Sequence, residues 1–157
     1  MTATSLSTTL LLLAASLVPS PGMAEDCGQL REDNAQSNAG CLLVQGSHLL
    51  MIQQNFNKKW SLPGGGKLDG ERAVCTAHRE TLEETGLNVQ VKFLIHDFSS
   101  NFRLYLCEAD TKVPLAPTDS LEVKRAAWLS SEERQSIRWR FPDQQPYIEK
   151  LVKKYGN

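Results

Sequence analysis

The stretch from Gly65 to Leu87 constrains the fold of this chain most strongly, because it predicts a glycine-rich loop leading into one amphipathic helix. Asp69 is a suitable N-cap residue, and Glu71 places negative charge in the first turn, where the positive end of the helix dipole stabilises it. Gly86 suits the left-handed conformation just past a last turn. The sequence therefore predicts a helix from about Gly70 to Thr85.

Three carboxylates crowd one face of this predicted helix. Glu80, Glu83 and Glu84 are spaced i, i+3 and i+4, so they fall within an arc of about 100°. Like charges at this spacing destabilise an isolated helix, and a divalent cation would compensate for placing them together. Hard oxygen ligands with no Cys or His on the same arc favour Mg²⁺ or Mn²⁺ over zinc. Alternatively, the three glutamates form a solvated acidic face.

The polar and glycine positions of this stretch follow a fixed pattern. Gly65, five residues, Glu71, seven residues and then the run from Arg79 to Leu87 succeed one another without a gap, after the lead-in from Trp60 to Gly65. This arrangement resembles the Nudix box, and its one soft position is Thr81, where that family usually has an aliphatic residue. So many fixed positions make the match far more specific than a short glycine motif.

The resemblance implies the chemistry of the site. Nudix proteins hydrolyse a nucleoside diphosphate linked to another moiety, by attack of water on phosphorus, with Mg²⁺ or Mn²⁺ bound at the box. Carried over position by position, Glu80 and Glu84 are the expected main metal ligands, and Glu83 is a further ligand or holds a metal-bound water. The carbonyl of Gly64 or Gly65 is an additional expected oxygen donor.

The resemblance also assigns supporting roles. Arg79 is expected to orient Glu80, Glu71 to brace the junction of loop and helix, and Gly86 to end the helix. A catalytically silent Nudix module that binds a nucleotide or a protein is the alternative function. Isomerase chemistry on a prenyl diphosphate is a third possibility, because a few proteins that carry the box perform it.

One further glutamate from outside the box often serves this family as base or ligand. Glu122, six residues before Trp128, is the first candidate here, and Glu108 is the second. The catalytic set expected from the resemblance is therefore Glu80, Glu83, Arg79 and Glu122. Alternatively, Glu122 is an exposed carboxylate at the entrance of a strand.

The N-terminal residues have the layout of a secretory signal peptide. Residues 1–24 contain no charged side chain, and a short apolar run is followed by prolines and small residues. The run is too short to span a bilayer, which takes roughly 20 apolar residues, so removal rather than anchoring is expected. We therefore expect a signal peptide at 1–24, a loosely held polar lead-in at 25–38 and a Nudix domain at 39–157, exported to the periplasm or secreted. If Met23 is the true start, the protein is instead cytoplasmic.

Four cysteines follow the expected cleavage point, which suggests up to two disulfides in an oxidising compartment. Three complete pairings are possible. Cys27 and Cys41 enclose a loop of about 15 residues, whose closure is worth roughly 3 kcal/mol, and this pair is our expectation. Alternatively, Cys75 and Cys107 are buried as small hydrophobic residues. The three histidines stand alone in the sequence, so each is expected at the surface or in packing rather than on a metal.

Length and charge limit the class of partner. A chain of 157 residues with 41% hydrophobic residues has room for one domain with a core. Its formal net charge is −1, and its Lys and Arg residues are scattered, which argues against binding duplex nucleic acid. A small phosphorylated substrate, such as a nucleotide derivative, fits better.

The remaining elements are predicted from alternation and turn residues. The order β-β-β-α-β-β-β-α predicts an α/β fold, a mixed sheet with helices on both faces, and the resemblance implies the same α/β/α sandwich. The predicted elements are strands at 40–45 and 48–53 around a turn at 46–47, a short strand at 60–62, strands at 89–98 and 102–108, a strand at 123–129 followed by a turn capped by Ser130, and a C-terminal helix opened by Pro142.

Overall fold

The computed structural model describes Cys27, Leu30 and residues 33–156, so the expected signal peptide lies outside the described residues. In chain order the elements are β1 (Asn38–Leu42), β2 (Val44–Gln45), β3 (His48–Gln54), β4 (Trp60–Ser61), β5 (Gly64–Gly65), α1 (Ala73–Thr85), β6 (Gln90–Phe98), β7 (Phe102–Glu108), β8 (Val123–Leu129), α2 (Ser131–Ser136), the 3₁₀ turn η1 (Pro142–Gln144) and α3 (Gln145–Tyr155).

The strands form two four-stranded sheets. The first has the order β5-β1-β7-β6 and is mixed, because β1 runs parallel to β7 while its other pairs are antiparallel. The second has the order β2-β3-β4, with β8 also paired to β3, and all its pairs are antiparallel. The predicted α/β class with a mixed sheet is therefore confirmed.

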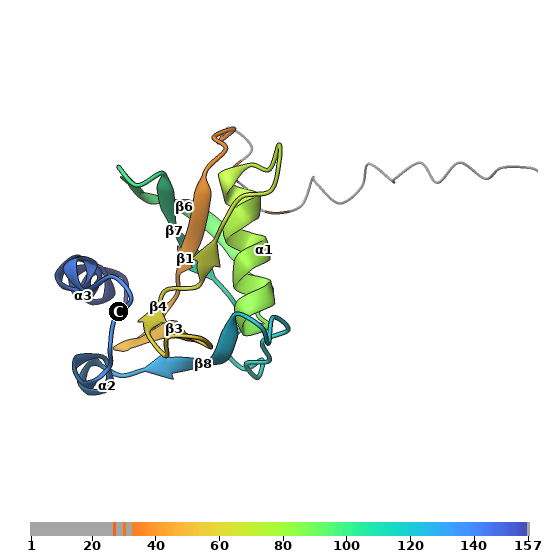
Figure 1. The fold of residues 1–157 in the computed structure, drawn as a ribbon. Helices are drawn as coiled ribbons and strands as arrows, with labels where there is room; N and C mark the ends of the chain where they lie inside the picture. The colour runs from red at the N-terminus through yellow and green to blue at the C-terminus, as the bar shows by residue number, and fades with distance from the viewer. Residues whose placement is uncertain (1–26, 28–29, 31–32, 157) are drawn as a thin grey trace, which may run out of the picture.

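Helices cover both sides of the strands: α1 lies on one side and α2 and α3 on the other (Figure 1). Consecutive residues of β1 show why, since side chains alternate across a strand. Cys41 packs into the core under α1, and Leu42 packs into the core under α3. Ala73, Val74 and Ala77 of α1 and Ile148, Leu151 and Val152 of α3 are the buried helix residues of these two cores.

The first predicted strand, at 40–45, is divided between the two sheets. β1 ends at Leu42 in the mixed sheet, and β2 resumes at Val44 in the antiparallel one. Leu43 at the break is 2% exposed, and its carbonyl accepts a hydrogen bond from the backbone N–H of Leu50. A run of buried residues gives no alternation from which a change of sheet can be predicted. The predicted turn at Gly46 joins β2 to β3, and Gly46 has a φ of +56°.

Helix α1 begins three residues later than predicted, at Ala73 instead of Gly70. The prediction of Asp69 as N-cap was wrong, because Arg72 occupies that position without a side-chain cap. Gly70 has a φ of +71°, which places a turn where the helix was expected to begin. Glu71 lies before the helix rather than in its first turn. The predicted end is confirmed, since Gly86 is the left-handed C-cap with a φ of 78°.

The polar lead-in is held firmly in its described part, contrary to the expectation. Asp33 forms an ion pair with Arg103 and accepts a hydrogen bond of 2.7 Å from the Tyr105 hydroxyl. The Ser37 hydroxyl donates to the carbonyl of Asn101 at 2.9 Å. The polar composition of the lead-in could not predict these contacts, because their partners lie about 65 residues or more away in sequence, on the β6–β7 hairpin.

Two disulfides are formed, and neither is the expected Cys27–Cys41 pair. Cys27 bonds Cys75 on α1, with a Cα–Cα distance of 4.8 Å, and Cys41 bonds Cys107 between β1 and β7, with a distance of 5.5 Å. The expected pair minimised the loop between the two residues. The fold instead places Cys41 and Cys107 on adjacent parallel strands, 66 residues apart in sequence. The alternative in which Cys75 and Cys107 remain free thiols was also wrong.

A buried arginine fastens the C-terminal helices to the antiparallel sheet. Arg134 of α2 is 1% exposed and forms an ion pair of 2.8 Å with Glu149 of α3. It also donates to the carbonyls of Ser47 and Leu129. The predicted cap of α2 is confirmed, because Ser130 and Glu133 form a capping box. The predicted helix after Pro142 is confirmed as α3, preceded by one 3₁₀ turn.

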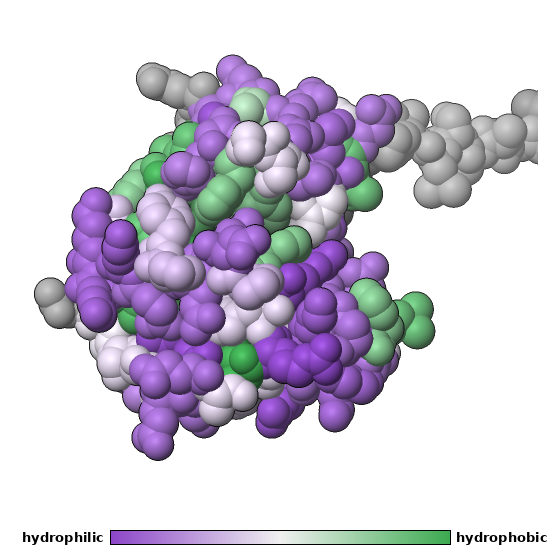
Figure 2. Space-filling model, turned by 60° about the vertical axis from the view of Figure 1, so that its left-hand side comes forward, coloured by the Kyte–Doolittle hydropathy of each residue, from purple (hydrophilic) through white to green (hydrophobic). Residues whose placement is uncertain are grey.

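The surface on the side of α2 and α3 is largely hydrophilic, with apolar residues gathered in a few patches (Figure 2). Within the part of the chain that the structure describes, every helix is too short or too polar to cross a membrane.

Candidate active site

Two glycines bring β5 into direct contact with α1 and β1. A Cβ on Gly65 would lie 2.4 Å from Oε2 of Glu80, and a Cβ on Gly64 would lie 2.5 Å from the Cα of Gly40. Gly64 also has a φ of +148°, which side chains rarely adopt. Only glycine therefore lets the backbone of β5 lie against the glutamates of α1.

Arg79 is the centre of an ion-pair network on α1. Its guanidinium donates to both carboxylate oxygens of Glu71 at 2.9 Å, to Glu80 at 2.8 Å and to Glu83 at 3.1 Å. It also donates to the carbonyl of Gly66 at 2.8 Å. Arg79 thus touches the glutamate that it was expected to orient, and it ties the preceding loop to the helix.

Glu71 joins the loop to the helix through three kinds of contact. Besides Arg79, its carboxylate accepts hydrogen bonds from the backbone N–H of Leu68 and from the hydroxyl of Thr76. Burial alone would favour the protonated carboxyl, but the hydrogen bonds from Arg79, Leu68 and Thr76 hold the pKa of Glu71 below its ordinary value. Glu71 is therefore charged in the folded protein at neutral pH.

Glu84 is the most deeply buried carboxylate of the cluster. It is 5% exposed, and it accepts a hydrogen bond of 2.7 Å from the backbone N–H of Gly64. Burial and, to a smaller extent, the nearby charges of Glu80, Glu122 and Asp119 together raise its pKa to about 8, although the hydrogen bond from the Gly64 N–H opposes the shift. Burial also raises the pKa of Glu80, although Arg79 opposes the shift. Negative charge is therefore costly at this point of the fold.

Glu83 and Glu122 lie at the rim of the cluster. The side chain of Glu83 is 45% exposed, and Arg79 is its ion-pair partner. Glu122 is exposed on the loop before β8, close enough for its charge to raise the pKa of Glu80 and of Glu84. The second candidate, Glu108, instead pairs with Lys92 at 3.1 Å, at the far end of β7.

The loop that carries Glu122 is docked on the C-terminal end of α1. The carbonyl of Glu83 accepts hydrogen bonds from the backbone N–H groups of Thr118 and Asp119 at 2.9 and 3.2 Å. The Asp119 carboxylate then accepts hydrogen bonds from the backbone N–H groups of Leu121 and Glu122, both at 3.1 Å. Asp119 therefore fixes the backbone next to Glu122, and the sequence analysis had missed it.

The oxygen donors of the cluster are hard ligands. Within the described residues, however, no three His, Cys, Asp or Glu side chains are grouped so that they could hold a metal ion. The histidines have other partners: His78 contacts Asn88 at 2.8 Å, and the ring of His96 packs edge-to-face against Phe98 and at a tilt against Tyr147. The donor set available to a cation thus consists of carboxylates and backbone carbonyls, which suits Mg²⁺ or Mn²⁺.

A cavity of about 370 Å³ opens beside the glycines of β5. Gly64, Gly65 and Gly66 form one part of its lining, which places the cavity next to Glu80 and Glu84. Five aromatic residues contribute to the rest of the lining: Trp60, Phe98, Phe102, Trp139 and Phe141. The carboxylate cluster and an aromatic cavity are therefore neighbours.

A match to a known domain family now decides the family of this chain. The NUDIX domain matches residues 34–151, most of the chain. The chain belongs to the NUDIX family. This NUDIX match begins before Ala39, where the domain was expected to start, and so includes Ser37 of the lead-in, which contacts the β6–β7 hairpin.

Similar proteins agree with this placement. A "Nucleoside diphosphate-linked moiety X motif 6" protein of Xenopus laevis is 38% identical over 60 residues, which are 36% of this chain and 28% of that protein. A "MutT-like protein" of Streptomyces ambofaciens is 29% identical over 102 residues, 62% of this chain and 64% of that protein. The chain thus spans less than two thirds of either relative. A solved structure of a UDP-X diphosphatase shares the fold, with a TM-score of 0.62 at 14% identity over 78% of this chain and 65% of that one.

The NUDIX box brings together most of the residues that the sequence singled out. Glu71, Arg79, Glu80 and Glu84 meet around β5, whereas Glu83 lies at the rim. Four of the five aromatic cavity residues were missed, and they come from the segment between α2 and α3 and from the β6–β7 hairpin. The alternation of basic and aromatic residues from Arg138 to Phe141 is the one signal that could have indicated them.

We expect Glu84→Gln to stabilise the metal-free protein at alkaline pH. The pKa of Glu84 is about 8 in the folded protein, against an ordinary value of 4.5, so between these pH values the folded state binds a proton that the unfolded state lacks. Wild-type stability should therefore fall as pH rises from about 5 to about 8, whereas a glutamine carries no such proton. One pKa unit corresponds to about 1.4 kcal/mol, so the gain at about pH 8.5 should reach a few kcal/mol.

Thermal unfolding in EDTA across this pH range measures the effect. Glu132→Gln, at an exposed position of α2, is the matched control and should follow the wild type. Parallel curves for wild type and Glu84→Gln would show that Glu84 has an ordinary pKa in the folded protein.

Asp119→Ala should loosen the loop that carries Glu122, and Asp119→Asn should not. The asparagine retains a side-chain oxygen that can accept from the N–H groups of Leu121 and Glu122, whereas alanine has none. Hydrogen exchange of these two amides should be faster in the alanine variant by about tenfold, the equivalent of about one hydrogen bond. Equal protection in all three proteins would mean that other contacts hold this backbone.

Proposed function

We propose that this protein hydrolyses a diphosphate bond in a nucleoside diphosphate derivative, with a divalent metal, by attack of water on phosphorus. The observation that carries the proposal is the pair of the buried Glu84 and the partly buried Glu80, held against the glycines of β5 at the edge of a cavity. The raised pKa values of both carboxyl groups mark a site where a cation would be stabilised.

Two carboxylates and a backbone carbonyl, with water completing the coordination shell, would suit Mg²⁺ or Mn²⁺. Glu80 and Glu84 would be the main ligands, with Glu83 as a further ligand or a holder of metal-bound water and the Gly65 carbonyl as another donor. When bound, such a metal neutralises phosphate charge and lowers the pKa of water. In the absence of a metal, the ion pairs of Arg79 with Glu71, Glu80 and Glu83 neutralise part of the carboxylate charge and so reduce the repulsion between these side chains.

The other box residues keep this arrangement in place. Arg79 holds the Glu80 carboxylate, and Glu71 holds Arg79 and the loop at Leu68. Gly86 ends α1 directly after the glutamates. Glu122, on the docked loop, would accept the proton of the attacking water as general base. It lies close enough to the two proposed ligands for its charge to raise the pKa of Glu80 and of Glu84.

The names of similar proteins support the substrate class. One relative is called a nucleoside diphosphate-linked moiety X protein, and the structural neighbour is called a UDP-X diphosphatase. Both names describe a nucleoside diphosphate joined to another group, which is the substrate that we propose here.

Hydrolysis of a panel of nucleoside diphosphate derivatives, with Mg²⁺ or Mn²⁺, tests the proposal. Glu84→Gln and Glu80→Gln should each lower kcat by at least about a hundredfold, because each removes charge that the proposed metal requires. The exposed Glu132→Gln variant should keep wild-type activity. Product release that is equal in wild type and in both site variants would refute the proposal. Binding without turnover by the wild type would favour a silent NUDIX module instead.

We also propose export, with removal of residues 1–24. The support is the uncharged apolar start of the sequence together with two disulfides, which persist in an oxidising compartment. The intact mass of protein from its native source should correspond to an N-terminus near Glu25 and to two disulfides. A chain that starts at Met1 or Met23 with four free thiols would contradict export.

A further inference from the structure

The segment that carries Glu122 is exposed to solvent. Ser120, Leu121 and Glu122 are all exposed, Leu121 by 87%, and burial resumes at Val123, which is 3% exposed. An exposed segment gains little free energy from burying apolar surface, so its backbone is held mainly by hydrogen bonds. The position of the Glu122 carboxylate therefore depends on the groups that bond this backbone.

Asp119 bonds the N–H side of the segment. Its carboxylate accepts from the N–H groups of Leu121 and Glu122, and its carbonyl accepts from the N–H of Val123 at 3.0 Å. Each residue also has a backbone carbonyl, which needs a donor of its own. Asp119 has no donor to spare for them, so the carbonyl side requires a second residue.

Asn55 supplies the donors for the carbonyl side. Its backbone N–H donates to the carbonyl of Glu122 at 2.7 Å, and its side-chain NH₂ donates to the carbonyls of Ser120 at 3.2 Å and Leu121 at 3.4 Å. The backbone bond extends the pairing of β3 with β8, whereas the two side-chain bonds require an amide at this position. Asn55 thus contacts three consecutive carbonyls, about 65 residues away in sequence.

Lys58 fixes the orientation of the Asn55 amide. Its ammonium group donates to the side-chain oxygen of Asn55 at 3.1 Å and also to the backbone carbonyl of Asn55. Since the amide oxygen faces Lys58, the NH₂ group faces the Glu122 segment. Lys58 itself has a φ of +59°, and its N–H donates to the carbonyl of Gln54 at 3.1 Å, which closes the turn.

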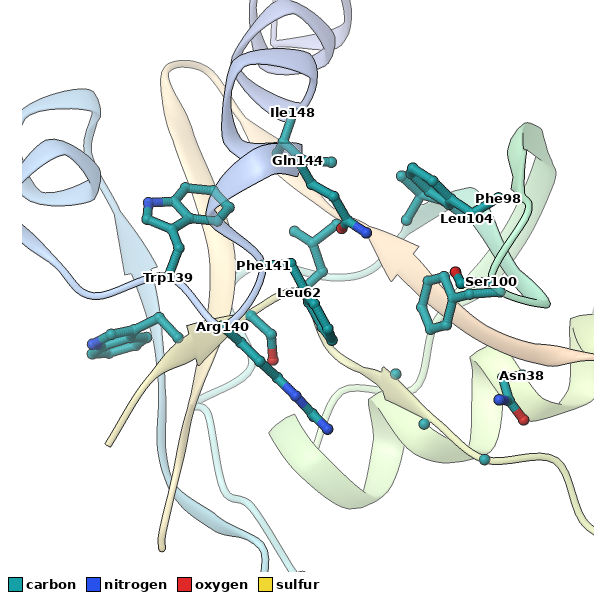
Figure 3. A pocket seen from close by; sticks show the side chains of 16 residues that line it. Asn38, Leu62, Phe98, Ser100, Leu104, Trp139, Arg140, Phe141, Gln144 and Ile148 are labelled. Carbon is teal, nitrogen blue, oxygen red and sulfur yellow. The ribbon is translucent and has the colours of Figure 1, made fainter. Parts of the chain in front are cut away.

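The turn that carries Asn55 is attached to ordered parts of the fold at both ends. Asn55 directly follows β3, the strand that pairs with β2, β4 and β8. On its other side the turn leads through β4 to Leu62, which lies in the cavity wall across from Phe98 and Ser100 (Figure 3). Groups supported by strands are placed more precisely than groups on loops. Asn55 therefore links the exposed Glu122 segment to the sheet.

We propose that Asn55 is a positioning residue that sets the place of Glu122 relative to the carboxylates of α1. Asn55 holds the carbonyl side of the segment, and Asp119 holds its N–H side. The inference rests on the proposed function, in which Glu122 accepts the proton of the attacking water, and it adds the residue that gives this exposed carboxylate its position. A general base that is displaced by about 1 Å loses much of its effect while the fold stays intact.

Steady-state kinetics test the catalytic part, with the compound of the nucleotide panel that the wild type hydrolyses fastest. Asn55→Ala should lower kcat by about tenfold and leave KM within about twofold, because the loss falls on proton transfer rather than on substrate binding. Asn55→Asp should not restore kcat, since it keeps the acceptor for Lys58 but has no N–H for the carbonyls. Lys58→Met should lower kcat less than Asn55→Ala, because it frees the amide without removing it.

Asn57 offers a matched control in the same turn. Its side chain donates to the side-chain oxygen of Gln54 at 2.8 Å and accepts from the N–H of Lys59 at 2.8 Å. Asn57→Ala therefore disturbs the turn without removing a bond to the Glu122 segment, and it should keep the wild-type kcat. Equal losses of kcat in Asn55→Ala and Asn57→Ala would overturn the proposal, because the turn would then matter only as a structural element.

A double-mutant cycle tests whether Asn55 acts through Glu122. Glu122→Gln alone should lower kcat by about a hundredfold, and adding Asn55→Ala should lower it no further, because an absent carboxylate cannot be displaced. Additive losses would refute the positioning role. Full activity of Glu122→Gln, beside an inactive Glu84→Gln, would refute this inference and keep the diphosphate hydrolase.

Hydrogen exchange in EDTA tests the contact without metal or substrate. The amides of Leu121 and Glu122 should exchange about tenfold faster in Asn55→Ala than in the wild type, and Asn57→Ala should leave them unchanged. Unchanged exchange in Asn55→Ala would overturn the proposal. Faster exchange in Asn55→Ala, at an unchanged melting temperature, together with no turnover of any compound by the wild type, would refute the hydrolase and keep Asn55 as the residue that positions Glu122.

Discussion

The contact between the backbone of β5 and two glutamates of α1 is the constraint on which this structure depends. The Gly64 N–H donates to Glu84, and Gly65 lies so close to Glu80 that any side chain would collide with it. The contact buries Glu84 and partly buries Glu80, which raises the pKa values of both carboxyl groups. A protein selected for stability alone would place an apolar side chain here, because isolated buried charge is costly. The unfavourable free energy of these carboxylates is explained if the site binds a cation, which would neutralise their charge, together with a phosphate.

Arg79 and the disulfides offset part of the destabilisation that the buried carboxylates cause. Arg79 forms ion pairs with three glutamates and contacts the loop before α1, which reduces the electrostatic repulsion within the cluster. Cys27–Cys75 connects the start of the described chain to α1, and Cys41–Cys107 joins the two central parallel strands under that helix. One bridge is thus attached to the helix that carries the glutamates, and the other joins strands on which that helix packs.

The aromatic lining of the cavity comes from a different part of the chain. The carboxylates stand on one helix, whereas the cavity combines the β6–β7 hairpin with the segment between α2 and α3. That segment is pinned to β4 by backbone hydrogen bonds on both sides of Trp139, and the buried Arg134 fixes the helices that flank it.

The sequence by itself determined the family, the α/β class, the strands at 102–108 and 123–129, the strand predicted at 89–98 to within one residue, and the glutamates of α1, because these depend on local spacing and alternation. It placed the start of α1 at Gly70, since nothing local shows that Glu71 turns back to Leu68 and Arg79 instead of joining the helix. Only the tertiary structure decided the disulfide pairs, the division of the first strand between two sheets, the docking of the Glu122 loop by Asp119, and the aromatic cavity. Each of these joins residues far apart in sequence, and such contacts are selected by packing in three dimensions rather than by the preferences of neighbouring residues.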